Sequence, residues 1–292
     1  RGTEAAAHAT RQYIAGLQLG HGVLKLDFNN AFNTIRRDAV FDAVRQELPE
    51  LYAFVYMCYK DTSLLNFGEH LLQSDEGVQQ GDPLGPLLYC ASTMKLVRSM
   101  TSELNLWYLD DGTIGGELHD LLHDLDTVRR VGPTIGLLLN EDKCEIVTND
   151  DSVVSSFRAV MPNILHTRGN DAVLLGAPIG DQSAIDNVLQ SKLTVFQRFA
   201  SRLTTLNAQD ALFLLKNCLG LPKLLYTLRC ASCYNSAVLS QYDTVVKQTL
   251  QVILNIDLTE PIWSQATLPG GLRVRLVTDM AMPAFLASIN GA

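Results

Sequence analysis

Apolar residues follow two different spacings along this chain. Over 22–27 and again over 106–115, β-forming residues alternate with polar or small ones, which predicts short strands. Between 118 and 128, five apolar residues recur at helical spacing, which predicts a helix that stops at Gly132-Pro133. Further helices are predicted over 3–19, 51–59, 83–100 and most of 184–255. Further strands are predicted within 64–73 and near 135–139, 143–148 and 172–176.

Two adjacent carboxylates stand between two of the predicted strands. Asp110 and Asp111 are followed by Gly112, and an Asp-Asp-Gly step between strand-like runs predicts a hairpin turn. Asp27 ends the upstream strand, and if that strand lies beside the hairpin, three acids converge. Like charges at that spacing repel unless a cation compensates them, and Mg²⁺ suits a site of few carboxylates that leaves positions for phosphates.

A glycine-rich turn lies between these acids in the sequence. The string Gly77-Val78-Gln79-Gln80-Gly81-Asp82-Pro83 leads into the helix predicted over 83–100. Asp82 is its predicted N-cap and Pro83 its first residue, and the positions expected to face inward are Leu84, Leu87, Leu88 and Ala91. Such a turn presents backbone amides and the Gln80 side chain to a nucleotide.

Four strings in order resemble a known family. They are Asp27-Phe28-Asn29-Asn30-Ala31-Phe32, Gln80-Gly81-Asp82-Pro83-Leu84-Gly85-Pro86-Leu87-Leu88, Tyr108-Leu109-Asp110-Asp111-Gly112, and Gly136-Leu137-Leu138-Leu139-Asn140-Glu141-Asp142-Lys143-Cys144-Glu145. Together they are similar to the palm of reverse transcriptases, closest to those of non-LTR retrotransposons. Each string alone is weak, and the ordered set is strong.

The resemblance implies roles for the matching residues. Asp27 and Asp110 would bind two Mg²⁺ ions, for which Mn²⁺ can substitute. Asp111 would be the second acid of the adjacent pair, and Phe28 would belong to the same set of metal-binding residues. Lys143 would protonate the leaving pyrophosphate.

The nucleotide site follows from the same resemblance. Phe32 would exclude the ribose 2′-hydroxyl and so select deoxynucleotides. Gln80 and Gly81 would contact the incoming nucleotide, and the backbone around Asn30 and Ala31 would lie under its triphosphate. The implied partners are an RNA template, a DNA primer and deoxynucleoside triphosphates.

The implied fold is α+β, a polymerase right hand whose palm is a ferredoxin-like antiparallel sheet with helices. Residues 1–180 would form the palm with partial fingers, 181–255 a helical thumb-like region, and 256–292 the start of a C-terminal connection segment. Because the first residues are Arg1-Gly2 and the family carries further fingers strands upstream, we expect an internal piece of a longer polyprotein.

Simpler interpretations exist for each residue. An Asp-Asp-Gly step can be turn chemistry alone, Phe32 can be a core residue, and Lys143 a solvated charge. Another template-dependent polymerase with the same palm, such as an RNA-directed RNA polymerase, is the alternative within the enzyme class. The alternative outside it is an inactive or domesticated retroelement remnant that binds nucleic acid or protein.

Charge is distributed unevenly along the chain. The formal net charge is −8, which is unusual for a protein that binds nucleic acid. Residues 101–151 hold 12 acidic side chains against 3 Lys and Arg, whereas 182–255 hold 7 Lys and Arg against 3 acids. The acidic part contains the proposed metal site, and the basic part coincides with the expected thumb.

Other features exclude further classes of site. The chain has no run of about 18 uninterrupted apolar residues, so we expect a soluble, intracellular protein without a membrane partner.

The six cysteines predict reduced, packed thiols, and Cys230 and Cys233 lack a second pair for zinc. His119 and His123 share a helix face at metal-binding spacing, and with Asp120, Asp124 and Asp126 around them we interpret this as a solvated polar face rather than a zinc site. No pattern indicates an oligomeric state.

Overall fold

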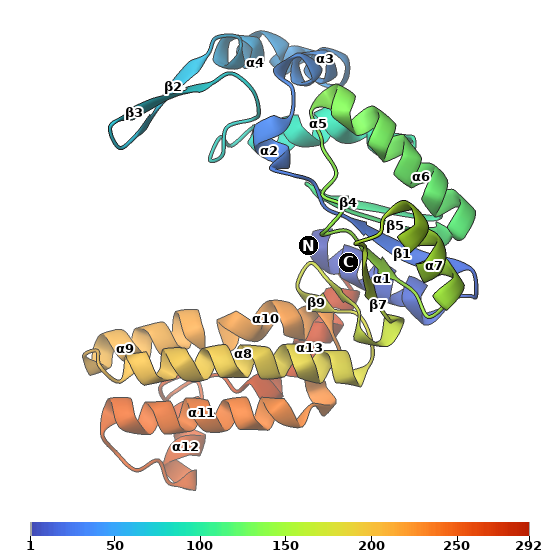
Figure 1. Ribbon diagram of the computed structural model, residues 1–292. Helices are drawn as coiled ribbons and strands as arrows, with labels where there is room; N and C mark the ends of the chain where they lie inside the picture. The colour runs from blue at the N-terminus through green and yellow to red at the C-terminus, as the bar shows by residue number, and fades with distance from the viewer. Residues whose placement is uncertain (1, 292) are drawn as a thin grey trace. The chain divides into compact units, whose positions relative to one another are not determined.

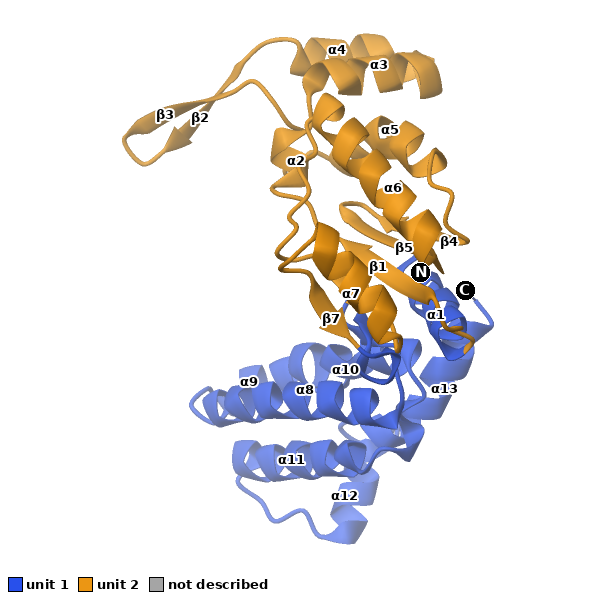
Figure 2. Cartoon of the chain, turned by 45° about the vertical axis from the view of Figure 1, so that its right-hand side comes forward, with its two compact units in different colours: residues 1–15, 168–292 blue, residues 16–167 orange. Residues whose placement is uncertain are grey.

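The computed structural model describes residues 2–291 and divides the chain into two compact units (Figure 2). Residues 16–167 form one, which we call the sheet unit. Residues 2–15 and 168–291 form the other, which we call the helical unit. The division falls after 167, whereas the sequence placed it at 180. The assignment of palm, thumb and connection segments to these stretches stays a prediction.

The sheet unit is built on five strands in the order β4-β5-β1-β6-β7. The strands are β1 (His21–Leu26), β4 (Leu104–Tyr108), β5 (Asp111–Glu117), β6 (Glu145–Val147) and β7 (Leu165–Thr167). All neighbours are antiparallel except β6 and β7, and β1 lies in the centre between β5 and β6. The antiparallel α+β architecture predicted from the sequence is confirmed.

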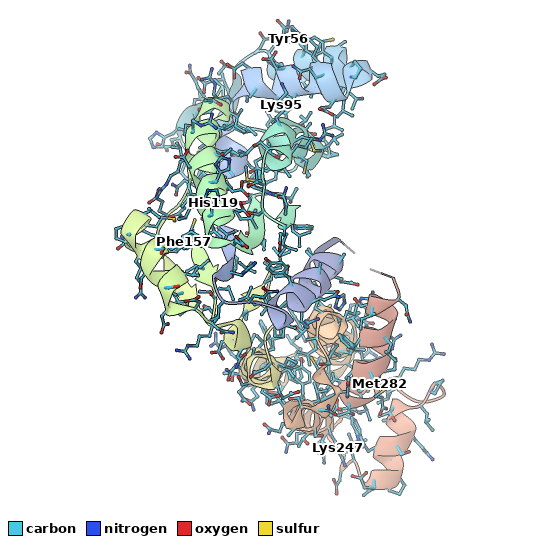
Figure 3. All side chains as sticks on the ribbon, turned by 90° about the vertical axis from the view of Figure 1, so that its right-hand side faces the viewer. Tyr56, Lys95, His119, Phe157, Lys247 and Met282 are labelled. Atoms are coloured by element: carbon cyan, nitrogen blue, oxygen red, sulfur yellow. The ribbon has the colours of Figure 1, made fainter. Side chains whose placement is uncertain are left out.

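The helices of the sheet unit pack on this sheet and on one another (Figure 1). They are α2 (Ala31–Thr34), α3 (Arg37–Glu47), η1 (Pro49–Leu51), α4 (Tyr52–Tyr59), α5 (Gly85–Arg98), α6 (Leu118–Val131), η2 (Gly132–Ile135) and α7 (Asp151–Val160). Helix α6 packs on β1 and β5, and α3 packs on α5. The core that they enclose contains Leu24, Ile114, Leu121, Ile146 and Phe157, each fully buried. Figure 3 labels Phe157 on α7, Lys95 on α5 and His119 on α6.

A separate hairpin leaves this core. Strands β2 (Ser63–Phe67) and β3 (His70–Ser74) pair only with each other, as the sequence predicted for 64–73. The buried guanidinium of Arg37 holds the base of the hairpin: it donates to the carbonyls of Tyr59, Asp61, Glu76 and Gly77 and to the hydroxyl of Ser74. These bonds fix where the chain enters the glycine-rich turn.

Several sequence predictions for the helices and strands of this unit were wrong. Helix α5 begins at Gly85 rather than Pro83, because the Asp82 carboxylate accepts from the Leu84 amide and closes a separate turn first. Leu88 and Ala91 are buried as predicted, together with Tyr89, whereas Leu87 is exposed. The segment 135–139 is not a strand; Leu139 makes only an isolated bridge to Phe28.

The helical unit is an assembly of helices around a second core. It contains α1 (Gly2–Ala15), η3 (Gly169–Asp171), β8 (Val173–Leu174), β9 (Ala177–Pro178), α8 (Gln182–Leu203), α9 (Ala208–Leu214), η4 (Leu215–Leu219), α10 (Leu221–Cys230), η5 (Cys233–Asn235), α11 (Ala237–Leu254), α12 (Glu260–Thr267) and α13 (Val277–Ile289). Helix α8 packs on α11 and α10 on α13. Side chains of α13 share the core with those of α8 and α11, so residues 256–291 are integral to this unit.

Polar contacts attach the N-terminal helix to the helical unit. Glu4 of α1 accepts two hydrogen bonds from Arg229, at 2.7 and 2.8 Å, and one from Ser288. The bonds from Arg229 lower the pKa of Glu4 to about 2, although burial opposes the shift. Arg11 donates to the carbonyls of Pro178 and Cys230.

One helical stretch among the described residues, 208–230, is long and apolar enough to cross a membrane by length and composition. In the structure it is divided into α9, a π-helical turn η4 and α10, with Gly220 between the last two. Its residues Ala211, Leu215, Leu224 and Leu228 lie in the core of the helical unit. The apolar composition is therefore that of a core segment. All six cysteines are free thiols, as predicted, but Cys58 and Cys218 are exposed, so the prediction of packed thiols was wrong for these two.

Candidate active site

The end of β1 meets the start of β5 in the sheet unit. The two strands are antiparallel neighbours, and their register pairs Leu26 with Gly112. Continuing the register by one residue brings Asp27 level with Asp111. The structure therefore places the upstream acid beside the acidic pair, as the sequence predicted.

The hairpin turn itself differs from the prediction. Tyr108 pairs with Asp111, so the two turn residues are Leu109 and Asp110, and Asp111 and Gly112 already belong to β5. Leu109 has a φ of 58°, in the left-handed region that costs a residue with a Cβ roughly 1–2 kcal/mol. This strained turn presents Asp110 at the tip of the hairpin.

Gly112 serves packing rather than turn formation. It lies opposite Trp107 across the hairpin, and a Cβ at this position would lie 3.0 Å from two atoms of the indole ring. The Trp107 ring stacks on Phe28, with ring centres 6.0 Å apart, and its Nε1 donates to Asn105. The glycine lets an aromatic ring lie over the strand that carries Asp111.

The three carboxylates interact electrostatically. Partial desolvation is the main cause of a raised pKa of Asp111, and the negative charges of Asp110 and Asp27 add to it. Lys25 opposes the shift, but its ammonium already forms an ion pair with Glu145. The site therefore has an excess of negative charge.

A divalent cation fits this donor set. Among residues 2–291, no group of three His, Cys, Asp or Glu side chains forms a ready-made metal cage. Mg²⁺ does not need one, because it is usually held by one or two carboxylates together with water and substrate phosphates. Asp27 and Asp110, with Asp111 adjacent, are the residues that would hold it.

Only the backbone of Phe28 is available to a ligand. Its side chain is 6% exposed and packs in the core, so the ring cannot contact a ligand. On one side of the chain, the Asp27 carbonyl accepts from Asn140 and the Asn29 amide donates to Leu138. Because neighbouring residues of an extended chain point their polar groups to opposite sides, the Phe28 carbonyl points toward β5.

The short helix α2 starts immediately after this segment. Its N-cap residue Asn30 is in the left-handed conformation, with a φ of 47°, and makes no side-chain capping bond. Ala31, the first helical residue, is buried. The amides of Asn33 and Thr34 donate to the Asn30 carbonyl, so the Ala31 and Phe32 amides are the first-turn donors left for a triphosphate.

The glycine-rich turn is attached to α2. The Val78 amide donates to the Phe32 carbonyl at 2.8 Å, and the Gly77 amide to the Ile35 carbonyl at 2.9 Å. Gly77 has a φ of 73°, and a Cβ there would lie 2.5 Å from the Asn33 carbonyl oxygen. Only glycine permits this close approach.

As a result, three of the predicted nucleotide-binding residues share one cavity. Phe32, Gln80 and Gly81 line a pocket of about 380 Å³ together with Asp82. The Tyr59 hydroxyl donates to the Asp82 carboxylate and steadies this turn. Burial and that bond raise the pKa of Tyr59 to about 12.

Lys143 lies in an exposed turn before β6. Its amide donates to the Asn140 carbonyl, and the Asn140 amide donates to the Asp27 carbonyl at 2.8 Å. The turn that carries Lys143 is thus bonded to the backbone of Asp27. No contact of its ammonium group distinguishes a catalytic lysine from a solvated one.

Sequence reasoning missed three residues that support the site. Tyr89 lies fully buried under Phe32, Leu109 adopts the strained conformation of the turn, and Asp124 is fully buried rather than solvated. Tyr89 follows the predicted inward residue Leu88 directly, and the helical spacing from Gly85 to Tyr89 is the sequence signal that could have found it. His119 is exposed on α6 (Figure 3).

Comparison with known proteins accounts for this arrangement. The sequence profile of the reverse transcriptase (RNA-dependent DNA polymerase) family matches residues 2–205. The chain belongs to the reverse transcriptase family. Over 280 residues this reverse transcriptase is 25% identical to the retrotransposable element SLACS 132 kDa protein of Trypanosoma brucei gambiense, covering 88% of the chain and 22% of that protein.

Solved structures show the same fold. A telomerase from Candida albicans, determined in a complex with a TWJ fragment of telomeric RNA, superposes with a TM-score of 0.53 at 11% identity. The match covers 98% of this reverse transcriptase chain and 47% of the telomerase chain. The fold is consistent with a polymerase palm, and reverse transcriptases generally depend on a divalent metal.

Proposed function

We propose that this chain is the polymerase segment of a retrotransposon-type protein and adds deoxynucleotides to a primer 3′ end on an RNA template. The observation that carries the proposal is the meeting of Asp27 with Asp110 and Asp111 at neighbouring strand ends. Their mutual repulsion, reflected in the raised pKa of Asp111, serves no structural purpose and is relieved by a bound cation.

Two Mg²⁺ ions held at these carboxylates would supply the chemistry of phosphoryl transfer: activation of the primer hydroxyl and stabilisation of the leaving pyrophosphate. Asp27 and Asp110 hold the metal-binding position, with the Phe28 carbonyl directed to the same side. The amides at the start of α2 bind the triphosphate. Lys143 would donate a proton to the pyrophosphate.

Selection of the nucleotide falls to the cavity beside α2. Phe32 and Gln80 line the same space, so one nucleotide can contact both. A half-buried phenyl ring there occupies volume that a ribose 2′-hydroxyl would need. We therefore expect deoxynucleotides as substrates, and an RNA template and a DNA primer as partners.

The relative from Trypanosoma and the telomerase support this proposal in different ways. The first is a retrotransposable element protein, and the chain spans about a fifth of it. The second shares the fold and is an RNA complex.

The test is primer extension on a primed RNA template with deoxynucleotides and Mg²⁺. Asp110→Asn removes one metal-binding charge and should abolish extension while leaving the melting temperature unchanged or higher. Asp120→Asn, at the surface of α6, is the matched control and should extend as the wild type does. Equal extension by Asp110→Asn and wild type would exclude the proposed site.

A further inference from the structure

Tyr89 is a buried polar residue that the proposed mechanism does not use. It lies in α5, has no exposed surface, and its ring stacks on Phe32 with centres 4.5 Å apart and planes 10° apart. Its hydroxyl is buried and has no hydrogen-bond partner among the described residues. A polar atom left in this state costs free energy, so its presence needs a reason.

The active-site carboxylates act electrostatically on this hydroxyl. Burial is the main cause of a raised pKa of Tyr89; the Asp110 carboxylate is the next cause, followed by Cys90 and then Asp111. The Tyr89 hydroxyl is a hydrogen-bond donor, and the Asp110 carboxylate that acts on it carries a negative charge that no cation of residues 2–291 compensates. The stacking on Phe32 fixes the ring, so that only the torsion of the O–H bond and the Asp110 side chain remain free to adjust.

A second tyrosine of the chain shows what a purely structural arrangement looks like. Tyr242 in the helical unit is also buried and stacks on Phe196, with centres 4.4 Å apart and planes 15° apart. Its hydroxyl donates to the carbonyls of Leu219, at 3.0 Å, and Gly220. The two tyrosines share burial and stacking, but only the hydroxyl of Tyr89 is left without a partner.

We infer that Tyr89 is a positioning residue whose hydroxyl donates a hydrogen bond to the Asp110 carboxylate, directly or across one ordered water, in the loaded active site. This inference rests on the proposed function and deepens it. Phenylalanine would keep the stacking on Phe32 without an unpaired hydroxyl, so packing alone does not account for tyrosine. The bond would orient Asp110 on its two-residue turn, where the backbone alone does not fix the carboxylate.

The test compares Tyr89→Phe with Tyr242→Phe. Both substitutions remove one buried hydroxyl and keep a stacked ring. We measure the melting temperature and, in single-nucleotide primer extension with Mg²⁺, kcat and KM for the deoxynucleotide. A hydrogen bond to a charged group predicts a fall in kcat of about tenfold or more for Tyr89→Phe. KM should stay within about twofold, because the hydroxyl acts through Asp110 and does not touch the nucleotide.

The melting temperatures separate this role from a structural one. Tyr89→Phe should leave the melting temperature unchanged or raise it, since an unpaired hydroxyl is removed. Tyr242→Phe should lower it and leave kcat unchanged. An unchanged kcat for Tyr89→Phe, or a fall in its melting temperature equal to that of Tyr242→Phe, overturns the inference alone. Failure of the wild type to extend any primer overturns the proposed function, and the inference with it.

Discussion

Asp124→Asn is the substitution that best tests how the catalytic hairpin is supported. Asp124 lies on α6 with no exposed surface, and its carboxylate accepts from the segment that leads into β4. The backbone amide and hydroxyl of Thr101 each donate at 2.9 Å, and the amide and hydroxyl of Ser102 at 2.9 and 2.5 Å. Strand β4 begins two residues later and ends at the turn that carries Asp110.

The expected loss in the free energy of unfolding follows from counting the groups that donate to Asp124. Asparagine keeps the shape of the side chain but replaces one acceptor oxygen with an NH₂ group. A hydroxyl can rotate to accept from that group. The Thr101 amide lies 2.9 Å from one carboxylate oxygen and 3.1 Å from the other, which the Ser102 amide also reaches. The favoured asparagine therefore keeps both amides on its one oxygen, but it loses the shorter bond from Thr101 and the charge of the acceptor. The loss of one bond to a charged acceptor should lower the free energy of unfolding by about 1.5–3 kcal/mol.

Urea denaturation measures this loss as a lower midpoint with an unchanged slope. Asp120→Asn on the same helix is the control and should change the free energy of unfolding by less than about 0.5 kcal/mol, because its side chain is at the surface. A loss below about 0.5 kcal/mol for Asp124→Asn would refute the conclusion that this carboxylate anchors the hairpin.

Three further predictions concern the site itself. Phe32→Ala should raise the relative kcat/KM for ribonucleotides by at least about tenfold in single-nucleotide extension, because the ring no longer fills the space of the 2′-hydroxyl. Gly112→Ala should lower the free energy of unfolding in urea by about 1–3 kcal/mol, because the new methyl group displaces the Trp107 ring. Asp111→Asn should raise the melting temperature at neutral pH: burial and Asp110 raise the pKa of Asp111 in the folded state, so its ionisation opposes folding.

Each of these has a distinct contrary result. Unchanged sugar selectivity in Phe32→Ala would make that ring a core residue only. Wild-type stability of Gly112→Ala would show that the indole has room to move. The gain from Asp111→Asn should shrink as the pH falls through the range between the raised pKa and the ordinary carboxyl pKa, where the wild-type acid becomes neutral. A gain that persists in acid would not arise from charge.

The sequence predicted the parts of the site that depend on local chemistry. Strand alternation ends at Asp27, and turn residues surround Asp110, so both acids could be placed at strand ends without coordinates. The pairing of β1 with β5 is a long-range property, and only the order of the family motifs indicated it. The same limit applies to the shared cavity of Phe32 and Gln80, which depends on main-chain bonds across some 45 residues.

The errors have physical causes. Asp-Asp-Gly chemistry favours a turn at Asp111-Gly112, but the register with β1 keeps these residues in β5 and moves the turn to Leu109. Aspartate is a residue type usually found at the surface, and only the hydrogen bond from Thr101 shows that Asp124 is a buried acceptor. Tertiary contacts decide both cases, and at Leu109 they outweigh a local preference of about 1–2 kcal/mol.

Single-nucleotide addition to a primed RNA template tests the central claim most directly. Four templates that differ only in the first unpaired base are each offered the four deoxynucleotides in turn, with Mg²⁺. We predict that the wild-type chain adds only the complementary deoxynucleotide to each template, and that Asp27→Asn adds none. Addition without regard to the template base, or equal addition by Asp27→Asn, would contradict a templated polymerase built on these carboxylates.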